Sequence, residues 1–146
     1  MRITVALLSL VCTNGSVSAE SLAGVDNPAR ARVNYMLNCQ GCHGPEGAGS
    51  IDGAVPTMQD YVGNFLGIAG GREFLVRVPG SANAALNDAA LAELLNWMLP
   101  TLSAKQMPEN FEPFLPEEVG RLRAVPLQDV SGMRAVLVAQ IERESS

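Results

Sequence analysis

The chain has 146 residues, 47% of them hydrophobic, and a formal charge of −5 at neutral pH. The length fits one small domain, and the hydrophobic fraction is that of an ordinary globular protein. The acidic balance, with a pI near 4.8, excludes a typical nucleic-acid-binding protein. It suits a protein steered towards a basic partner surface, although the same charge also serves ordinary solubility.

The first nineteen residues have the pattern of a secretory signal peptide. Arg2 supplies a positive charge, residues 3–11 are an apolar run, and small residues end at Ala19. The run is too short to span a membrane. We therefore expect cleavage near Ala19, which exports the protein to the periplasm and discards Cys12. Loss of Arg2 brings the formal charge of the mature chain to −6, one below the −5 of the full sequence.

A helix is predicted from Pro28 to Cys39. Asn27 is a favourable N-cap residue, and Pro28 suits the first helical position. Apolar residues recur along the segment at helical spacing, at Ala29, Val33, Met36 and Leu37. The helix leads directly into the next motif.

Residues 39–43 read Cys-Gln-Gly-Cys-His, the pattern of covalent c-type haem attachment. In this pattern two thiols bind the vinyl groups on one porphyrin edge, and the adjacent imidazole ligates the iron. His43 is the only histidine in the sequence. We predict that Cys39 and Cys42 bind one haem c covalently and that His43 is the iron ligand.

Two other readings of the cysteine pair are weaker. A redox-active dithiol usually follows a strand in a βαβ unit, whereas the approach to Cys39 is helical. A structural zinc site needs four ligands, and once Cys12 is removed no further cysteine or histidine remains to complete one.

The middle of the chain alternates loops with short elements. Residues 44–50 are rich in glycine and predict a loop around the proximal side of the haem. A short helix is expected over 60–68, and glycines at 70–71 end it. Residues 72–78 fit either a short helix or an extended segment, and the following Pro-Gly pair at 79–80 predicts a loop.

A strong amphipathic helix is predicted over 89–99, capped by Asn87-Asp88 and ended by Pro100. Residues 103–116 contain several prolines and are expected to be irregular. A short helix over 116–123 and a last helix from Asp129 or Ser131 to Arg143 complete the chain. The last helix has four apolar residues in register, at Val130, Met133, Leu137 and Ile141.

Over about residues 27–99, the motif, the capped helices and the proline turn at 55–58 together resemble a class I, single-haem cytochrome c. The resemblance implies an all-α fold, with a small helical domain around one covalent haem at 20–100 and a C-terminal helical extension at 101–146. It implies that the first helix crosses the 89–99 helix, so that Tyr35 or Met36 meets Leu94 and Trp97. It also implies that the carbonyl of Pro56 accepts a hydrogen bond from His43 Nδ1.

The chain departs from this family where an axial methionine usually lies. The loop before the 89–99 helix, residues 78–85, contains no methionine, histidine or lysine. Three alternatives remain for the sixth iron position. It is open or holds water, it takes Met107 from beyond the helix, or it takes Met58 by a different loop path. Met98 shares the apolar helix face and is expected to be a core residue.

The expected function is that of a periplasmic cytochrome that carries single electrons, with a periplasmic dehydrogenase or oxidase as partner. Such a carrier breaks no bond, so it is not an enzyme and has no catalytic residues. One alternative is a five-coordinate haem protein that binds a small ligand or reduces peroxide. Another is a haem subunit fixed to a larger redox enzyme by its extension, although we expect that extension to dock on its own domain.

Overall fold

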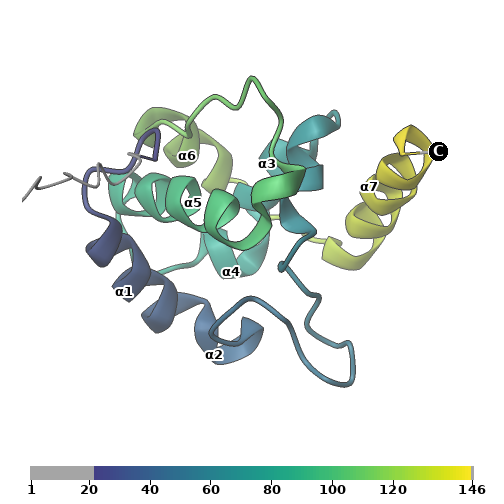
Figure 1. Ribbon diagram of the computed structural model, residues 1–146, viewed down its shortest axis with the longest axis horizontal. Coiled ribbons are helices and arrows are strands. Elements are labelled where there is room, and N and C mark those ends of the chain that lie inside the picture. The colour runs from purple at the N-terminus through teal and green to yellow at the C-terminus, as the bar shows by residue number, and fades with distance from the viewer. Residues whose placement is uncertain (1–21, 146) are drawn as a thin grey trace, which may run out of the picture.

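The computed structural model describes residues 22–145, so the predicted signal peptide lies outside the described residues. Within this range the regular secondary structure is exclusively helical, which confirms the predicted all-α fold (Figure 1). No helix in the described range is long and apolar enough to cross a membrane. The elements are α1 (Pro28–Asn38), α2 (Gln40–His43), η1 (Val62–Gly67), α3 (Gly71–Arg77), α4 (Pro79–Ala82), α5 (Asp88–Ser103), η2 (Ala104–Gln106), α6 (Pro116–Arg123) and α7 (Val130–Glu144).

Helix α5 runs through the middle of the molecule, and α1 and α6 pack against it (Figure 1). The rings of Tyr35 on α1 and Trp97 on α5 lie 5.9 Å apart between centroids, which confirms the expected meeting of these helices. Both helices begin as predicted, because Asn27 and Asn87 accept hydrogen bonds from the backbone N–H groups of Arg30 and Ala90.

The prediction that Pro100 ends the central helix is wrong, since α5 continues through it to Ser103. Proline lacks an N–H group, which removes one bond from the helical ladder. The extra turn is held by tertiary contacts, because Leu99 and Ser103 are fully buried. The Ser103 hydroxyl also accepts a hydrogen bond from Gly63 N at 3.0 Å. The expected domain limit at residue 100 therefore lies inside a helix.

The buried face of α1 differs from the apolar pattern of its sequence. Ala31 and Tyr35 are buried against the core. Val33, Met36 and Leu37 are instead exposed, by 50%, 50% and 77%. Met36 accordingly stays outside the contact with α5, and the three residues form an apolar surface on the outer side of α1, which we call the α1 patch.

The two helices directly before α5 in the chain are α3 and α4. The ambiguous stretch after Gly71 is helical, and this is α3. The loop expected at Pro79 is a short helix, α4, which begins directly after Val78 ends α3. Only residues 83–86 separate α4 from the N-cap of α5, so this side of the molecule has no long loop.

The C-terminal extension packs on its own domain. Helix α7 contacts η1 and α3, and it contributes Leu137 and Ile141 to the hydrophobic core. Met133, which was predicted to share this buried stripe, is 41% exposed. The segment expected to be irregular contains the single turn η2, and α6 has the predicted bounds.

Candidate functional site

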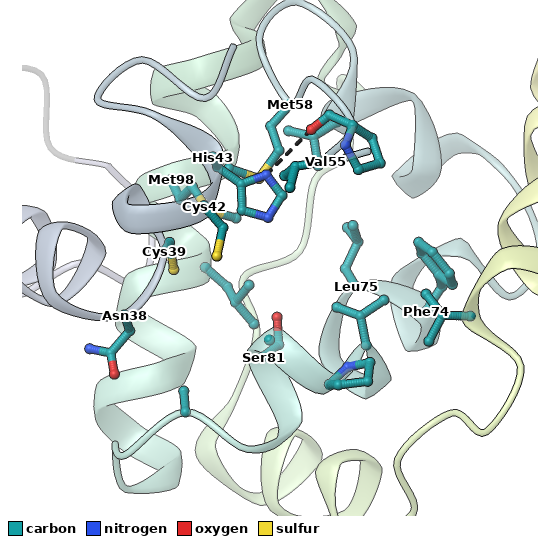
Figure 2. Close-up of a pocket in the computed structure, with 18 of the residues that line it drawn as sticks. Asn38, Cys39, Cys42, His43, Val55, Met58, Phe74, Leu75, Ser81 and Met98 are labelled. Atoms are coloured by element: carbon teal, nitrogen blue, oxygen red, sulfur yellow. Dashed lines mark hydrogen bonds between the residues drawn. The ribbon is translucent and has the colours of Figure 1, made fainter. Parts of the chain in front are cut away.

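A cavity of about 360 Å³ lies between α2, the 54–58 loop, α3, α4 and α5 (Figure 2). This volume is within the range of roughly 300–1,000 Å³ that is usual for ligand and cofactor sites. Its lining is mainly apolar and includes Phe65, Phe74, Leu75, Val78, Leu91, Leu94, Leu95 and Met98. The three residues predicted to bind the cofactor, Cys39, Cys42 and His43, all line it.

Helix α1 delivers the cysteines to one edge of this cavity. The backbone N–H of Cys39 bonds to the carbonyl of Tyr35, and the Tyr35 hydroxyl donates to the carbonyl of Gly44 at 2.7 Å. The segment that holds both thiols is thereby fixed at its two ends. Burial, helped by the nearby Cys42, raises the pKa of the Cys39 thiol to about 11. A reactive dithiol pair needs a lowered thiol pKa, so this environment argues against the dithiol alternative.

The imidazole of His43 points into the cavity from α2 (Figure 2). Its Nδ1 lies 3.3 Å from the carbonyl oxygen of Pro56, which is the contact expected from the sequence. A carbonyl oxygen only accepts, so Nδ1 carries the hydrogen and Nε2 keeps the lone pair that faces the cavity. Burial lowers the pKa of His43 and favours the neutral imidazole that a metal requires.

The position of the Pro56 carbonyl depends on the glycine-rich loop. Gly49 has φ +78°, and a Cβ there would lie 2.8 Å from the carbonyl carbon of Pro56 and against the Val55 oxygen. Ser50 N donates to that Val55 oxygen at 3.0 Å, and Met58 N donates to Gly47 O at 2.6 Å. The loop and the 55–58 turn therefore pack backbone to backbone, which only glycine permits at position 49.

The donor set fits a c-type haem better than a zinc ion. Within residues 22–145, no group of three or more histidine, cysteine, aspartate or glutamate side chains is arranged to hold a metal ion. A single imidazole, two thiols at the rim and an apolar interior instead match a large flat cofactor that is bound covalently along one edge.

The methionines considered as sixth ligands lie in different places. Met58 and Met98 line the cavity, and Figure 2 shows both near His43 and Cys42. Met107 follows η2 and is not among the residues that line it.

Sequence reasoning missed two residues of the site. Arg134 on α7 lines the cavity, and among the described lining residues it is the one with a permanent charge. It lies four residues after Val130, which also lines the cavity. This spacing places both residues on one face of the predicted last helix, and that was the available sequence signal. Ser81 on α4 lines the cavity on the side opposite His43 (Figure 2).

Comparison with curated proteins finds two similar relatives, both cytochromes c-552. One is from Thermus thermophilus and the other from a specified strain of that species. Each is 34% identical to the chain over 113 residues, covering 65% of this chain and 86% or 76% of the relative. No protein-family model matches the chain, and no solved structure matches it.

Proposed function

The chain belongs to the class I cytochrome c family, and on this basis we propose that it is an exported carrier of single electrons. Cys39 and Cys42 bind one haem c through thioether bonds, and His43 ligates its iron. The observation that carries the proposal is the arrangement of these three residues. The lone imidazole directs its free nitrogen into an apolar cavity, and both thiols lie at the cavity's edge.

Haem c, when bound, supplies an iron that alternates between ferrous and ferric states, so one electron is stored without breaking a bond. The residues of the chain hold and orient it. Burial lowers the pKa of His43, which favours the neutral imidazole, and the Pro56 carbonyl orients its ring. Apolar side chains such as Leu75 and Leu94 exclude water from the cavity. No side chain has to move a proton, so the function needs no catalytic residue.

Arg134 provides a positive charge that can balance the negative charges of a bound haem. Haem carries two carboxylates, and an acidic protein needs a cation to hold them. Arg134 lines the cavity, is partly buried, and has no hydrogen-bond or ion-pair partner among residues 22–145. Its guanidinium would pair with a haem carboxylate, and the C-terminal extension would then be part of the cofactor site.

The α1 patch supports contact with a redox partner near the cofactor. Val33, Met36 and Leu37 are exposed and lie within one or two turns of Cys39. An apolar surface beside a thioether edge, on a chain whose mature charge is −6, suits a partner with an apolar centre and a basic rim. We propose a periplasmic dehydrogenase or oxidase as that partner.

Packing of α7 on its own domain favours a free carrier over a subunit anchored by its tail. Leu137 and Ile141 are 3% and 7% exposed, so the C-terminal half of the apolar stripe of α7 is already covered by its own domain. A tail that used these two residues to anchor the protein to another subunit would leave them exposed in the isolated chain.

Covalent haem is tested by expressing the full chain together with a cytochrome c maturation system. The wild type is expected to keep its colour after denaturing gel electrophoresis and to give a one-haem pyridine haemochrome. Single Cys39→Ala and Cys42→Ala variants are expected to lose one thioether bond and the double variant to be colourless on the gel. A colourless wild type would overturn the proposal.

Export and electron transfer are tested on the same preparation. Mass spectrometry is expected to show a mature chain that begins at Glu20 in the periplasmic fraction. A redox titration is expected to follow a one-electron curve, with about 59 mV per tenfold change in ratio. Retention of residues 1–19 or a two-electron curve would contradict these parts of the proposal.

A further inference from the structure

The side of the cavity opposite His43 offers no side chain that normally ligates haem iron. In the described residues this side is formed by the end of α3, by α4 and by the short segment after it. Figure 2 shows Leu75 and Ser81 there, across the cavity from the imidazole. Residues 78–86 contain no methionine, histidine or lysine. The polar side chain that lines the cavity from this segment is the Ser81 hydroxyl.

The two methionines that line the cavity lie at the His43 end. Met58 comes two residues after Pro56, whose carbonyl contacts His43. Its terminal methyl lies 3.5 Å from the position of a Cβ on Gly47, so the side chain packs on the loop that follows the imidazole. Met98 is drawn beside Cys42 and away from Ser81 (Figure 2). Both thioethers therefore lie nearer His43 than Ser81 in this view (Figure 2).

The segment opposite His43 is held in place by a single arginine. The guanidinium of Arg123 donates to the carbonyls of Ala82, Ala84 and Leu86 at 2.7–3.0 Å. It also pairs with Asp88 at the start of α5, at 3.3 Å. These bonds hold the short connection between α4 and α5 beside the cavity, and Met107 is not among the residues that line it.

From this arrangement we propose that the pocket binds a small neutral diatomic molecule beside Ser81, on the side of the haem iron that no protein side chain ligates. The inference rests on the proposed attachment of haem c at Cys39, Cys42 and His43. It goes beyond that function because an electron carrier needs no exchangeable position on the iron.

The lining selects the chemical class of the ligand. Leu75, Val78 and Ala84 surround the position with apolar groups, which suits a neutral diatomic such as carbon monoxide or nitric oxide. The Ser81 hydroxyl has no hydrogen-bond partner among residues 22–145 and is free to donate to the bound molecule. Reduction of peroxide requires a group that moves a proton, most often a histidine, and the only histidine is on the other side.

Carbon monoxide is the probe, used on the reduced holoprotein. The absorption spectrum is expected to change on addition of the gas and to give a saturable binding curve. Ser81→Ala is expected to weaken binding about fivefold, the effect of one lost hydrogen bond, and to shift the C–O stretching frequency. Ser81→Met places a thioether on this side and is expected to abolish binding and convert the iron to a low-spin state.

Three variants test the competing ligands. Met107 lies outside the cavity, so Met107→Leu is expected to leave the spin state and the carbon monoxide affinity unchanged. Met58→Leu and Met98→Leu alter the cavity lining, and both variants are expected to keep the wild-type spin state and to bind carbon monoxide still. The inference would be overturned if the wild type were low-spin and did not bind carbon monoxide, while one of these variants did bind it. The pyridine haemochrome keeps the two proposals apart, because absence of covalent haem refutes the proposed function, whereas covalent haem with methionine ligation refutes only the open position.

Discussion

Glu93 on α5 accepts two hydrogen bonds from the Arg30 guanidinium on α1, at 2.7 and 2.8 Å. Its Oε1 also accepts from the backbone N–H groups of Asp26 and Asn27, at 3.1 and 2.8 Å. The Glu93 side chain is only 7% exposed. One carboxylate therefore links the beginning of α1, the helix that leads into the cysteine motif, to the middle of α5, which lines the cavity.

Replacing Glu93 by glutamine is expected to destabilise the fold by about 2 kcal/mol, the typical value for hydrogen bonds to a charged group. The amide keeps one acceptor for the backbone but turns a donor towards the guanidinium of Arg30. Denaturant unfolding of the variant and the wild type measures the difference. Glu117→Gln removes an exposed carboxylate from α6 and is expected to change the free energy of unfolding by less than about 0.5 kcal/mol. Equal effects at the two positions would contradict the role of Glu93.

The same contact predicts a dependence of stability on pH. Hydrogen bonding from Arg30 holds the pKa of Glu93 below its ordinary value of roughly 4.3. A lowered folded-state pKa gives stability that is complete above the unfolded pKa and is lost as the pH falls through the folded one. The wild type is therefore expected to lose more stability than Glu93→Gln between neutral pH and about pH 3. Parallel unfolding curves for both proteins would refute this expectation.

Gly49→Ala is expected to disturb the turn that orients His43. The added Cβ meets the backbone at Val55 and Pro56, so the turn must shift. Gly53→Ala is the matched control, since Gly53 also has positive φ, at +74°, but nothing lies within 4 Å of its Cβ position. Both substitutions are expected to lower the free energy of unfolding by about 1–2 kcal/mol, because a Cβ is unfavourable in the left-handed backbone conformation. Only Gly49→Ala should also shift the His43 ring resonances and the haem spectrum, and identical spectra would contradict the packing described.

Local signals carried the predictions near the site that the structure bears out. The spacing of Cys39, Cys42 and His43 is a local chemical pattern, and all three residues line one cavity, whereas their binding of haem stays a prediction. The caps at Asn27 and Asn87 need only neighbouring backbone to act. These features were readable because each depends on residues within a few positions of one another.

The errors came from contacts between distant segments. A proline costs roughly 3 kcal/mol inside a helix, yet burial of Leu99 and Ser103 keeps α5 intact through Pro100. Helical spacing in α1 could not show which face meets α5, and the more polar face that contains Ala31 and Tyr35 is the buried one. The bonds from Arg123 to the segment before α5 span about forty residues, which no periodicity reveals.

Shortening Leu137 to alanine is expected to detach α7 from its own domain. The side chain is 3% exposed in the core, and truncation of a buried leucine costs roughly 2–5 kcal/mol. Val136 is 62% exposed on the same helix, so Val136→Ala should cost less than about 0.5 kcal/mol. Thermal unfolding and limited proteolysis at residues 124–129 measure the two effects. Equal stability of the two variants would mean that the extension does not depend on this contact.

Replacing Arg134 by glutamine is expected to lower the reduction potential of the holoprotein. A positive charge beside the cavity favours the reduced form, which carries one positive charge less than the oxidised form, and removal of that charge reverses the effect. The change is expected to be of order 1 kcal/mol, because Arg134 is only partly buried and solvent screens its charge. Arg143→Gln is the control, since it removes the same charge from an exposed position on the same helix. Redox titrations of the three proteins compare the effects, and a shift of equal size in both variants would show that Arg134 acts only through net charge and does not hold a cofactor carboxylate.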